Sequence, residues 1–233
     1  MSLLLNLFDC VFFNFLIIFS MGNIKQGILG GFSGKVGTVI GSSWKGINYM
    51  RGLAPNIKDA RTAKQLAQRE KFALALSFLR PMQSFIRVGF KMHALRQTAF
   101  NAAMSYTLRN VVKGVSPNLS IDFAKVMVSR GSLLLPLNIQ RLNNDGEIAL
   151  SWVDNSGVGN ALDSDFAMPM AYNADKNEVV YDMASSCRGD EGVGLDYPSN
   201  WVGDTVHVYL GFVSENGSLV SDSVYVGEMV IEN

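Results

Sequence analysis

Acidic residues are scarce in one part of this chain. Residues 21–115 contain only two, Asp59 and Glu70, against 15 of the 20 Lys and Arg, which gives that part a net charge of +13. Residues 116–233 have the opposite excess, 17 acids against five basic residues, for a net charge of −12, and Asp9 completes the formal zero. This asymmetry predicts a polyanionic partner, or basic and acidic surfaces that meet within one copy or between copies.

Cysteine and histidine are also scarce. The two cysteines, Cys10 and Cys187, lie far apart and match no redox or zinc spacing, which excludes a disulfide framework and favours a reducing, cytoplasmic location. The two histidines, His93 and His207, fall in a predicted helix and a predicted strand, where packing is the simpler role than general-base catalysis. We therefore expect a non-enzymatic protein without a cofactor.

No phosphate loop or metal-binding loop is present. The pair Gly34-Lys35 invites a Walker interpretation, but Leu29 stands where that motif needs glycine and Val36 where it needs Ser or Thr. The acids that gather in the C-terminal loops show no EF-hand order, so we expect them to solvate loops rather than to bind calcium. These acids are Asp163, Asp165, Asp190, Glu191 and Asp196.

The first twenty residues form a hydrophobic leader. They contain no Lys or Arg and end in Ile-Phe-Ser, unlike a signal peptide. Asn6, Asp9 and Asn14 interrupt the apolar run, unlike a membrane span. We expect Met21 to be the true start and the leader to be a start-site artefact, while a membrane anchor and a cleaved signal remain alternatives. A membrane or secreted location is predicted only if the leader is real.

Residues 21–57 are predicted to form a glycine-rich basic arm. Nine glycines lie between Gly22 and Gly52, a density that disfavours helix. The stretches 35–40 and 43–50 have strand character, so a glycine-hinged arm or hairpin is the expected structure. Its folding is predicted to depend on what it packs against.

Residues 58–115 are predicted to be a basic helical hairpin. Thr62 and Gln65 have the spacing of a capping box, and apolar residues follow at helical intervals, which predicts a helix over 62–80. A second helical stretch is predicted over 81–112, with a bend at Gly89 and a stop at Gly114.

Residues 116–233 are predicted to be an acidic, all-β domain. The apolar period changes to two after Pro117, and turns with Asn, Asp and Gly recur about every ten residues. The strands are expected at 123–129, 137–142, 147–153, 166–173, 178–182, 205–213 and 220–229. Seven short strands with Trp152 in the third predict an immunoglobulin-like or fibronectin-like sandwich, and the whole chain is predicted to be α+β.

Basic residues alternate with aromatic ones in the N-terminal part. This pattern suits single-stranded nucleic acid, because bases stack on aromatic rings while cations contact phosphates. Core packing of the aromatic side chains and simple solvation of the lysines remain the alternative. The candidate contact residues for nucleic acid or an acidic partner are Lys35, Trp44, Lys45, Tyr49, Arg51, Arg61, Lys64, Arg69 and Lys71.

Several motifs resemble a family of Bacteroidota proteins of unknown function, domain of unknown function 6266. They run through nearly all of the chain after Met21 and include 24–37, 41–46, 99–106, 128–131 and 150–157. The resemblance implies no activity, ligand or catalytic residue. It supports Met21 as the start.

A shorter segment resembles a pattern of phage-type proteins, N-P-R-T-x-x-Q-x-x-x-R. Arg61 to Gln65 and Arg69 match it, whereas Asp59-Ala60 replaces the Asn-Pro. The resemblance implies a link to phages or mobile elements and a virion-associated location as the alternative to the cytoplasm.

Three functional hypotheses follow. The first is a binding or structural protein whose basic half contacts nucleic acid or an acidic partner. The second is a self-assembling protein in which the basic half of one copy docks on the acidic half of its neighbour, as a homo-oligomer. The third is a surface-anchored adhesion module, which requires the leader.

Overall fold

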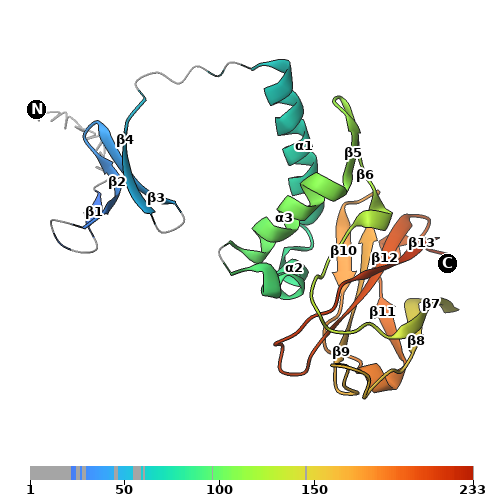
Figure 1. Ribbon diagram of the computed structural model, residues 1–233. Helices are drawn as coiled ribbons and strands as arrows, with labels where there is room; N and C mark the ends of the chain where they lie inside the picture. The colour runs from blue at the N-terminus through green and yellow to red at the C-terminus, as the bar shows by residue number, and fades with distance from the viewer. Residues whose placement is uncertain are drawn as a thin grey trace, which may run out of the picture. The chain divides into compact units, whose positions relative to one another are not determined.

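The computed structural model describes residues 22–24, 27, 30–44, 47–54, 59, 61–95, 97–144 and 146–232. The predicted leader and Lys45 lie outside the described residues. The chain divides into two compact units, residues 1–60 and 61–233 (Figure 1).

The first unit contains a four-stranded antiparallel sheet. Its strands, in spatial order, are β1 (Asn23–Ile24), β2 (Phe32–Val36), β3 (Val39–Trp44) and β4 (Ile47–Gly52). Gly37 takes a φ of 58° in the two-residue turn between β2 and β3, where few other residues would be relaxed. At Gly41 a Cβ atom would lie 2.6 Å from the Phe32 ring, so the glycine lets this ring lie on the sheet.

The sheet of the first unit has no hydrophobic core of its own among its described residues. Val36 is 54% exposed, Ile47 67% and Met50 71%. Four strands without a buried face are normally marginal, because backbone hydrogen bonds alone do not outweigh the entropy of ordering the chain.

The second unit begins with α1 (Ala63–Leu79), and its predicted capping box is confirmed. The Gln65 amide donates to Thr62 Oγ1 at 3.4 Å, and the Thr62 amide donates to Gln65 Oε1 at 3.2 Å. Two groups that the first turn leaves unsatisfied are thus bonded locally, which explains why the helix starts here.

The prediction of a single helical stretch over 81–112 is wrong. It consists of α2 (Gln83–Gly89), the 3-10 turn η1 (Lys91–His93) and α3 (Ala99–Asn110), which Thr98 caps. The physical reason is at Gly89, whose carbonyl oxygen accepts the Arg130 amide at 2.8 Å. A Cβ at Gly89 would lie 2.3 Å from the Val128 carbonyl oxygen, so only glycine allows this approach.

The predicted stop at Gly114 is instead part of a hairpin. Strands β5 (Val112–Val115) and β6 (Asn118–Ile121) pair antiparallel directly after α3. Gly114 has a φ of 91°, and a Cβ there would lie 2.1 Å from the Asn118 carbonyl oxygen. The glycine thus ends the helical region by opening a strand pair rather than a simple loop.

The remaining strands form two antiparallel sheets, so the chain is α+β as predicted. One sheet has the order β10 (Glu178–Tyr181), β9 (Phe166–Asn173), β12 (Thr205–Val213), β13 (Val224–Val230). The other has the order β11 (Gly192–Asp196), β8 (Glu147–Val153), β7 (Leu137–Asn144).

Two strand predictions need correction. The segment 123–129 is not a strand but the 3-10 turn η2 (Phe123–Lys125) and an extended run that the helices cover. There the Val128 amide donates to Ser223 Oγ at 2.9 Å rather than to a neighbouring strand. Strand β11 was not predicted, because its sequence GVGLD has two glycines and little strand character.

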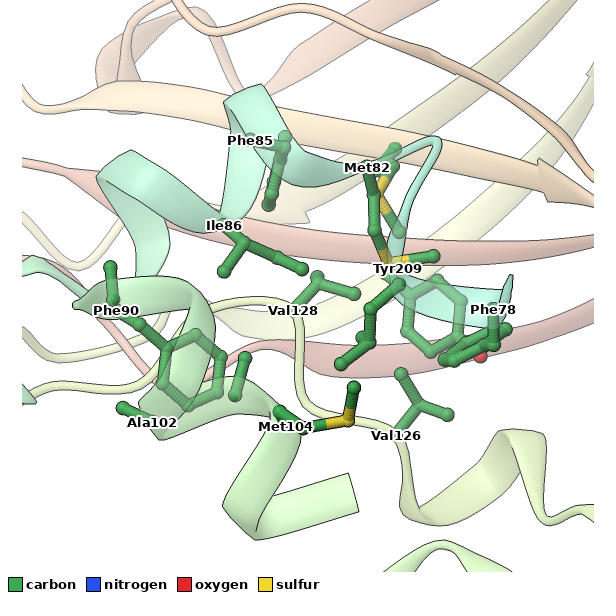
Figure 2. Close-up of a cluster of buried hydrophobic side chains, with 14 of the residues drawn as sticks. Phe78, Met82, Phe85, Ile86, Phe90, Ala102, Met104, Val126, Val128 and Tyr209 are labelled. Atoms are coloured by element: carbon green, nitrogen blue, oxygen red, sulfur yellow. The ribbon is translucent and has the colours of Figure 1, made fainter. Parts of the chain in front are cut away.

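Strands β9 and β12 are buried on both faces. On one face, Met168, Met170 and Tyr209 join the helices in a single cluster, which Figure 2 shows around Phe78, Met82 and Phe85. On the other face a second cluster joins these strands to β8 and β11. It contains Ile148, Leu150, Trp152, Val193, Leu195, Val206, Val208, Leu210 and Phe212. The second unit is thus built in three layers, with this sheet in the middle.

Candidate polyanion-binding surface

The predicted contact residues divide between the two units. Lys35, Tyr49 and Arg51 lie in the N-terminal sheet, and Trp44 lies at the end of β3, where it pairs with Ile47. The other predicted cations lie just before or within α1 of the second unit. These are Arg61, Lys64, Arg69 and Lys71.

The register of the N-terminal sheet brings three predicted residues to one face. Lys35 is opposite Ile40, which is opposite Arg51, and residues directly opposite in a sheet share a face. Tyr49 precedes Arg51 by two residues and therefore lies on that face as well. The Tyr49 side chain is 45% exposed. Two cations about 10 Å apart, two strand spacings, thus share a face with an accessible aromatic ring that lies beside Arg51 along β4.

The predicted cations of α1 do not share one face. Lys64 and Lys71 are seven residues apart and lie on the same side of the helix, whereas Arg69 lies about 140° further round. Arg61 precedes the helix with a φ of 44°. The first turns of α1 are exposed on most sides, so both sides of the helix present positive charge to solvent.

Several cations of the helical region are not paired with an acid of the described residues. The ion pairs Lys125–Asp122, Lys176–Asp204 and Arg188–Asp165 all lie within residues 116–233. Six cations of the helical region have no carboxylate partner among the described residues, namely Lys64, Lys71, Arg80, Arg87, Arg109 and Lys113.

Two polar contacts of the helical region illustrate this. The Lys91 ammonium donates to the Gly217 carbonyl oxygen at 3.0 Å, not to a carboxylate. The Glu70 carboxylate accepts a hydrogen bond from the Ser116 hydroxyl, not from a cation. Positive charge thus stays uncompensated even where the two regions of opposite sign meet.

A groove that the sequence did not indicate lies between η1, α3 and the segment that follows η2. It has a volume of about 440 Å³ and is lined by His93, Tyr106, Arg109 and Arg130, among others. The guanidinium carbon of Arg130 lies 5.7 Å from the centre of the Tyr106 ring. No sequence motif links Arg109 with Arg130, since the fold alone brings them to one groove.

A buried arginine also escaped prediction. Arg188 is fully buried in the second unit, where its Nη2 lies 3.1 Å from Asp165 Oδ2. Its Nη1 donates to Asn155 Oδ1 at 2.7 Å, and its guanidinium carbon lies 4.6 Å from the centre of the Phe212 ring. Asp165, one of the loop acids, therefore neutralises a buried cation.

His207 is packed between aromatic rings. Its ring is stacked on Phe123 with centroids 3.6 Å apart, and Nδ1 lies 3.0 Å from the Tyr225 hydroxyl. Burial lowers the pKa of His207 below its usual value, so the imidazole is neutral at pH 7.

Cys187 shows no sign of activation as a nucleophile. Burial, and then the nearby acids Asp190, Glu215 and Asp163, raise the pKa of the Cys187 thiol. A reactive cysteine needs the opposite environment, one that stabilises the thiolate.

Within the described part of the chain, no group of three or more His, Cys, Asp or Glu side chains is arranged to hold a metal ion. Among the same residues, no helix combines the length and the apolar character that crossing a membrane requires.

Comparison with known proteins gave one match. The model of a family described as a family of unknown function (DUF6266) matches residues 31–227. No match was found among curated proteins or among solved structures. The resemblance predicted from the motifs is thereby confirmed.

Proposed function

Since the chain belongs to the DUF6266 family, whose function is unknown, we propose from its own residues that it is a non-enzymatic binding or structural protein. Its basic N-terminal half contacts nucleic acid or an acidic partner. The observation that carries this proposal is the group of six helical cations that have no carboxylate partner among the described residues.

Unpaired cations on one region repel one another, and a polyanion relieves that repulsion. On a nucleic acid, each cation that contacts a phosphate also releases a condensed counterion, which adds an entropic gain. The shared face of Lys35, Tyr49 and Arg51 supports the nucleic-acid form of the proposal. An exposed ring on the same face as two cations suits a base that stacks on the ring while the cations contact phosphates.

The test is a salt series with the full chain, freed of nucleic acid. We expect single-stranded DNA and RNA to bind, with log Kd rising linearly with the logarithm of salt concentration. Arg51→Gln should weaken binding and lower the salt slope by about one contact. The matched control is Lys125→Gln, which removes one charge from an exposed side chain already paired with Asp122. Binding that is absent, or that ignores salt, refutes the nucleic-acid form.

Self-assembly is the second candidate, and the N-terminal sheet favours it. The exposed apolar side chains of Val36, Ile47 and Met50 lack a core, and the acidic region of a neighbouring copy offers an oppositely charged surface. Head-to-tail contacts of this kind build rings or filaments. Sedimentation at low and high salt tests it, because electrostatic assemblies dissociate as screening rises. A monomer at both salt concentrations refutes it.

We also propose that the two sheets form an immunoglobulin-like or fibronectin-like sandwich. In chain order as A, B, C, C′, E, F and G, the strands give sheets A–B–E and C′–C–F–G, as in fibronectin-type sandwiches. Trp152, in the second strand, packs edge-on against Phe212 with centroids 5.2 Å apart. Superposition of an experimental structure on such sandwiches tests this.

The phage-like segment at the start of α1 supports a link to a phage or mobile element and a cytoplasmic or virion-associated location. Mass spectrometry of purified particles and of cell fractions tests that location, and it also determines whether residues 1–20 are present. Recovery only in the membrane fraction with an intact leader would favour the surface-anchored alternative instead.

A further inference from the structure

The groove beside α3 concentrates polar side chains on one helix face. Ser105, Tyr106, Arg109 and Asn110 line it, and their spacing of one, three and four residues places them along the same side of α3. Ala102 lies one turn earlier and is buried at the same face. The opposite wall comes from η1 and the residues after it, with His93 and Gln97.

The third wall carries a second guanidinium. Arg130 follows the buried run of Val128 and Ser129, and its backbone amide is fixed to Gly89. Its side chain lies over the Tyr106 ring. The Tyr106 hydroxyl is itself held by the Lys125 carbonyl oxygen at 3.3 Å. The ring and the guanidinium are thus supported by contacts on both sides of the groove.

The charge of this groove is one-sided. Arg109 and Arg130 line it, no carboxylate does, and neither arginine forms an ion pair with a residue of the described chain. The adjoining groove, which shares Tyr106, Arg109 and Asn110 with this one, is lined by an acid, Asp222, whose Oδ1 accepts the Gly131 amide at 3.0 Å. Two guanidinium groups without a counter-charge favour an anion between them.

We propose that this groove binds a phosphate group, with Arg109 and Arg130 as its two cationic contacts. Planar guanidinium groups match phosphate oxygens in pairs of hydrogen bonds, which a lysine does not. His93, Ser105 and Asn110 supply further polar contacts, and the volume of about 440 Å³ admits a phosphate with an attached sugar or base. The ligand is a free phosphate monoester or a phosphodiester of a nucleic acid. The site lies outside the N-terminal sheet, but Arg109 is also one of the six cations on which the proposed function rests, so the experiment has to separate the two proposals.

The test uses the full chain and two probes, inorganic phosphate and a short single-stranded DNA with or without a 5′-phosphate. Binding is followed by calorimetry and by amide NMR at constant ionic strength. The double variant Arg109→Gln/Arg130→Gln removes the two contacts. The matched control Lys125→Gln/Lys176→Gln also removes two positive charges, from side chains that are paired with Asp122 and Asp204 and do not line the groove. Circular dichroism verifies that both variants are folded.

We expect at least a tenfold loss of affinity for each groove arginine removed, because each removal deletes charge-assisted hydrogen bonds to the phosphate oxygens. The control should retain most of the affinity. Phosphate binding that only the groove variant loses assigns a monoester ligand. DNA binding that only the groove variant loses, without phosphate binding, assigns the phosphodiester source.

Two results would overturn the proposal. The first is an equal loss in both double variants, which would mean diffuse attraction rather than a site. The second is the absence of any groove-dependent binding, which leaves the proposed function intact if Arg51→Gln still weakens DNA binding. Conversely, groove-dependent phosphate binding by a chain that binds neither nucleic acid nor an acidic partner would sustain this inference and refute the proposed function.

Discussion

The N-terminal sheet and the second unit are both built on antiparallel strands, but hydrophobic side chains are buried only in the second, among the residues described. In the second unit, β9 and β12 are covered on both faces, whereas Met50 in the N-terminal sheet is mostly exposed. Burial of apolar surface is the main stabilising contribution in folding. The comparison predicts that the second unit is stable by itself, while the N-terminal sheet has no buried apolar side chains among its described residues to stabilise it.

The largest expected difference between the two comes from truncating one apolar side chain in each. Phe85 is fully buried and packs edge-on against Tyr181, so Phe85→Ala should lower the free energy of unfolding by about 3–5 kcal/mol. Met50→Ala, at an exposed position, should change it by less than about 0.5 kcal/mol. Denaturant titration, followed by tryptophan fluorescence, measures the free energy of unfolding of both variants. Equal effects would break the comparison.

The next prediction compares the stability contributed by a buried ion pair with that of an exposed ion pair. Asp165→Asn leaves the fully buried Arg188 without its counter-charge and should cost about 3 kcal/mol. Asp122→Asn breaks the exposed pair with Lys125 and should cost no more than about 1 kcal/mol. The same titration compares them. A small cost at Asp165 would mean that Arg188 finds sufficient compensation in its bonds to Asn155 and the Leu134 carbonyl.

Glycines provide a third contrast. Gly89→Ala places a Cβ against the Val128 carbonyl oxygen and should cost about 1–3 kcal/mol, because the helix and the extended run must separate. At Gly52 in the N-terminal sheet, a Cβ meets nothing within 4 Å, so Gly52→Ala should be neutral or slightly stabilising. Thermal melting of both variants measures these changes in stability. A neutral Gly89→Ala would remove our explanation for the end of α2.

The smallest expected effect is the pH dependence that His207 confers on the second unit. Burial lowers its folded pKa below the unfolded value of about 6.5, so the unfolded chain binds the proton more readily. His207 therefore contributes its full stabilisation at pH values above the unfolded pKa. As the pH falls from the unfolded pKa to the folded pKa, that stabilisation is lost. His207→Gln should flatten that decline between pH 7 and 5, whereas His93→Gln should retain it. Urea midpoints across that range measure the slope.

Local signals in the sequence predicted local structure well. Thr62 and Gln65 sufficed to place the start of α1, because both partners of a capping box lie within one turn. Alternation and turn residues likewise predicted most strands of the acidic region. The sequence predicted a bend at Gly89 but not that the helix ends there, because the cause is a segment forty residues later that approaches the Gly89 backbone.

The candidate sites divide in the same way. Lys35, Tyr49 and Arg51 came from a pattern within a short stretch, and the strand register places them on one face. Arg130 and Arg188 gave no such signal, since each acquires its partners from elements distant in the sequence. Arg188 was notable only as one of five basic residues in an acidic region.

The double coverage of β9 and β12 determines where the chain can be cut. A fragment that starts at residue 116, where the charge changes sign, lacks α1, α2 and α3, which cover one face of these strands. Met168, Met170 and Tyr209 would then form an open apolar surface, and such a fragment should aggregate. The net charge changes sign at residue 116 of the sequence, but the folded protein cannot be divided at that point.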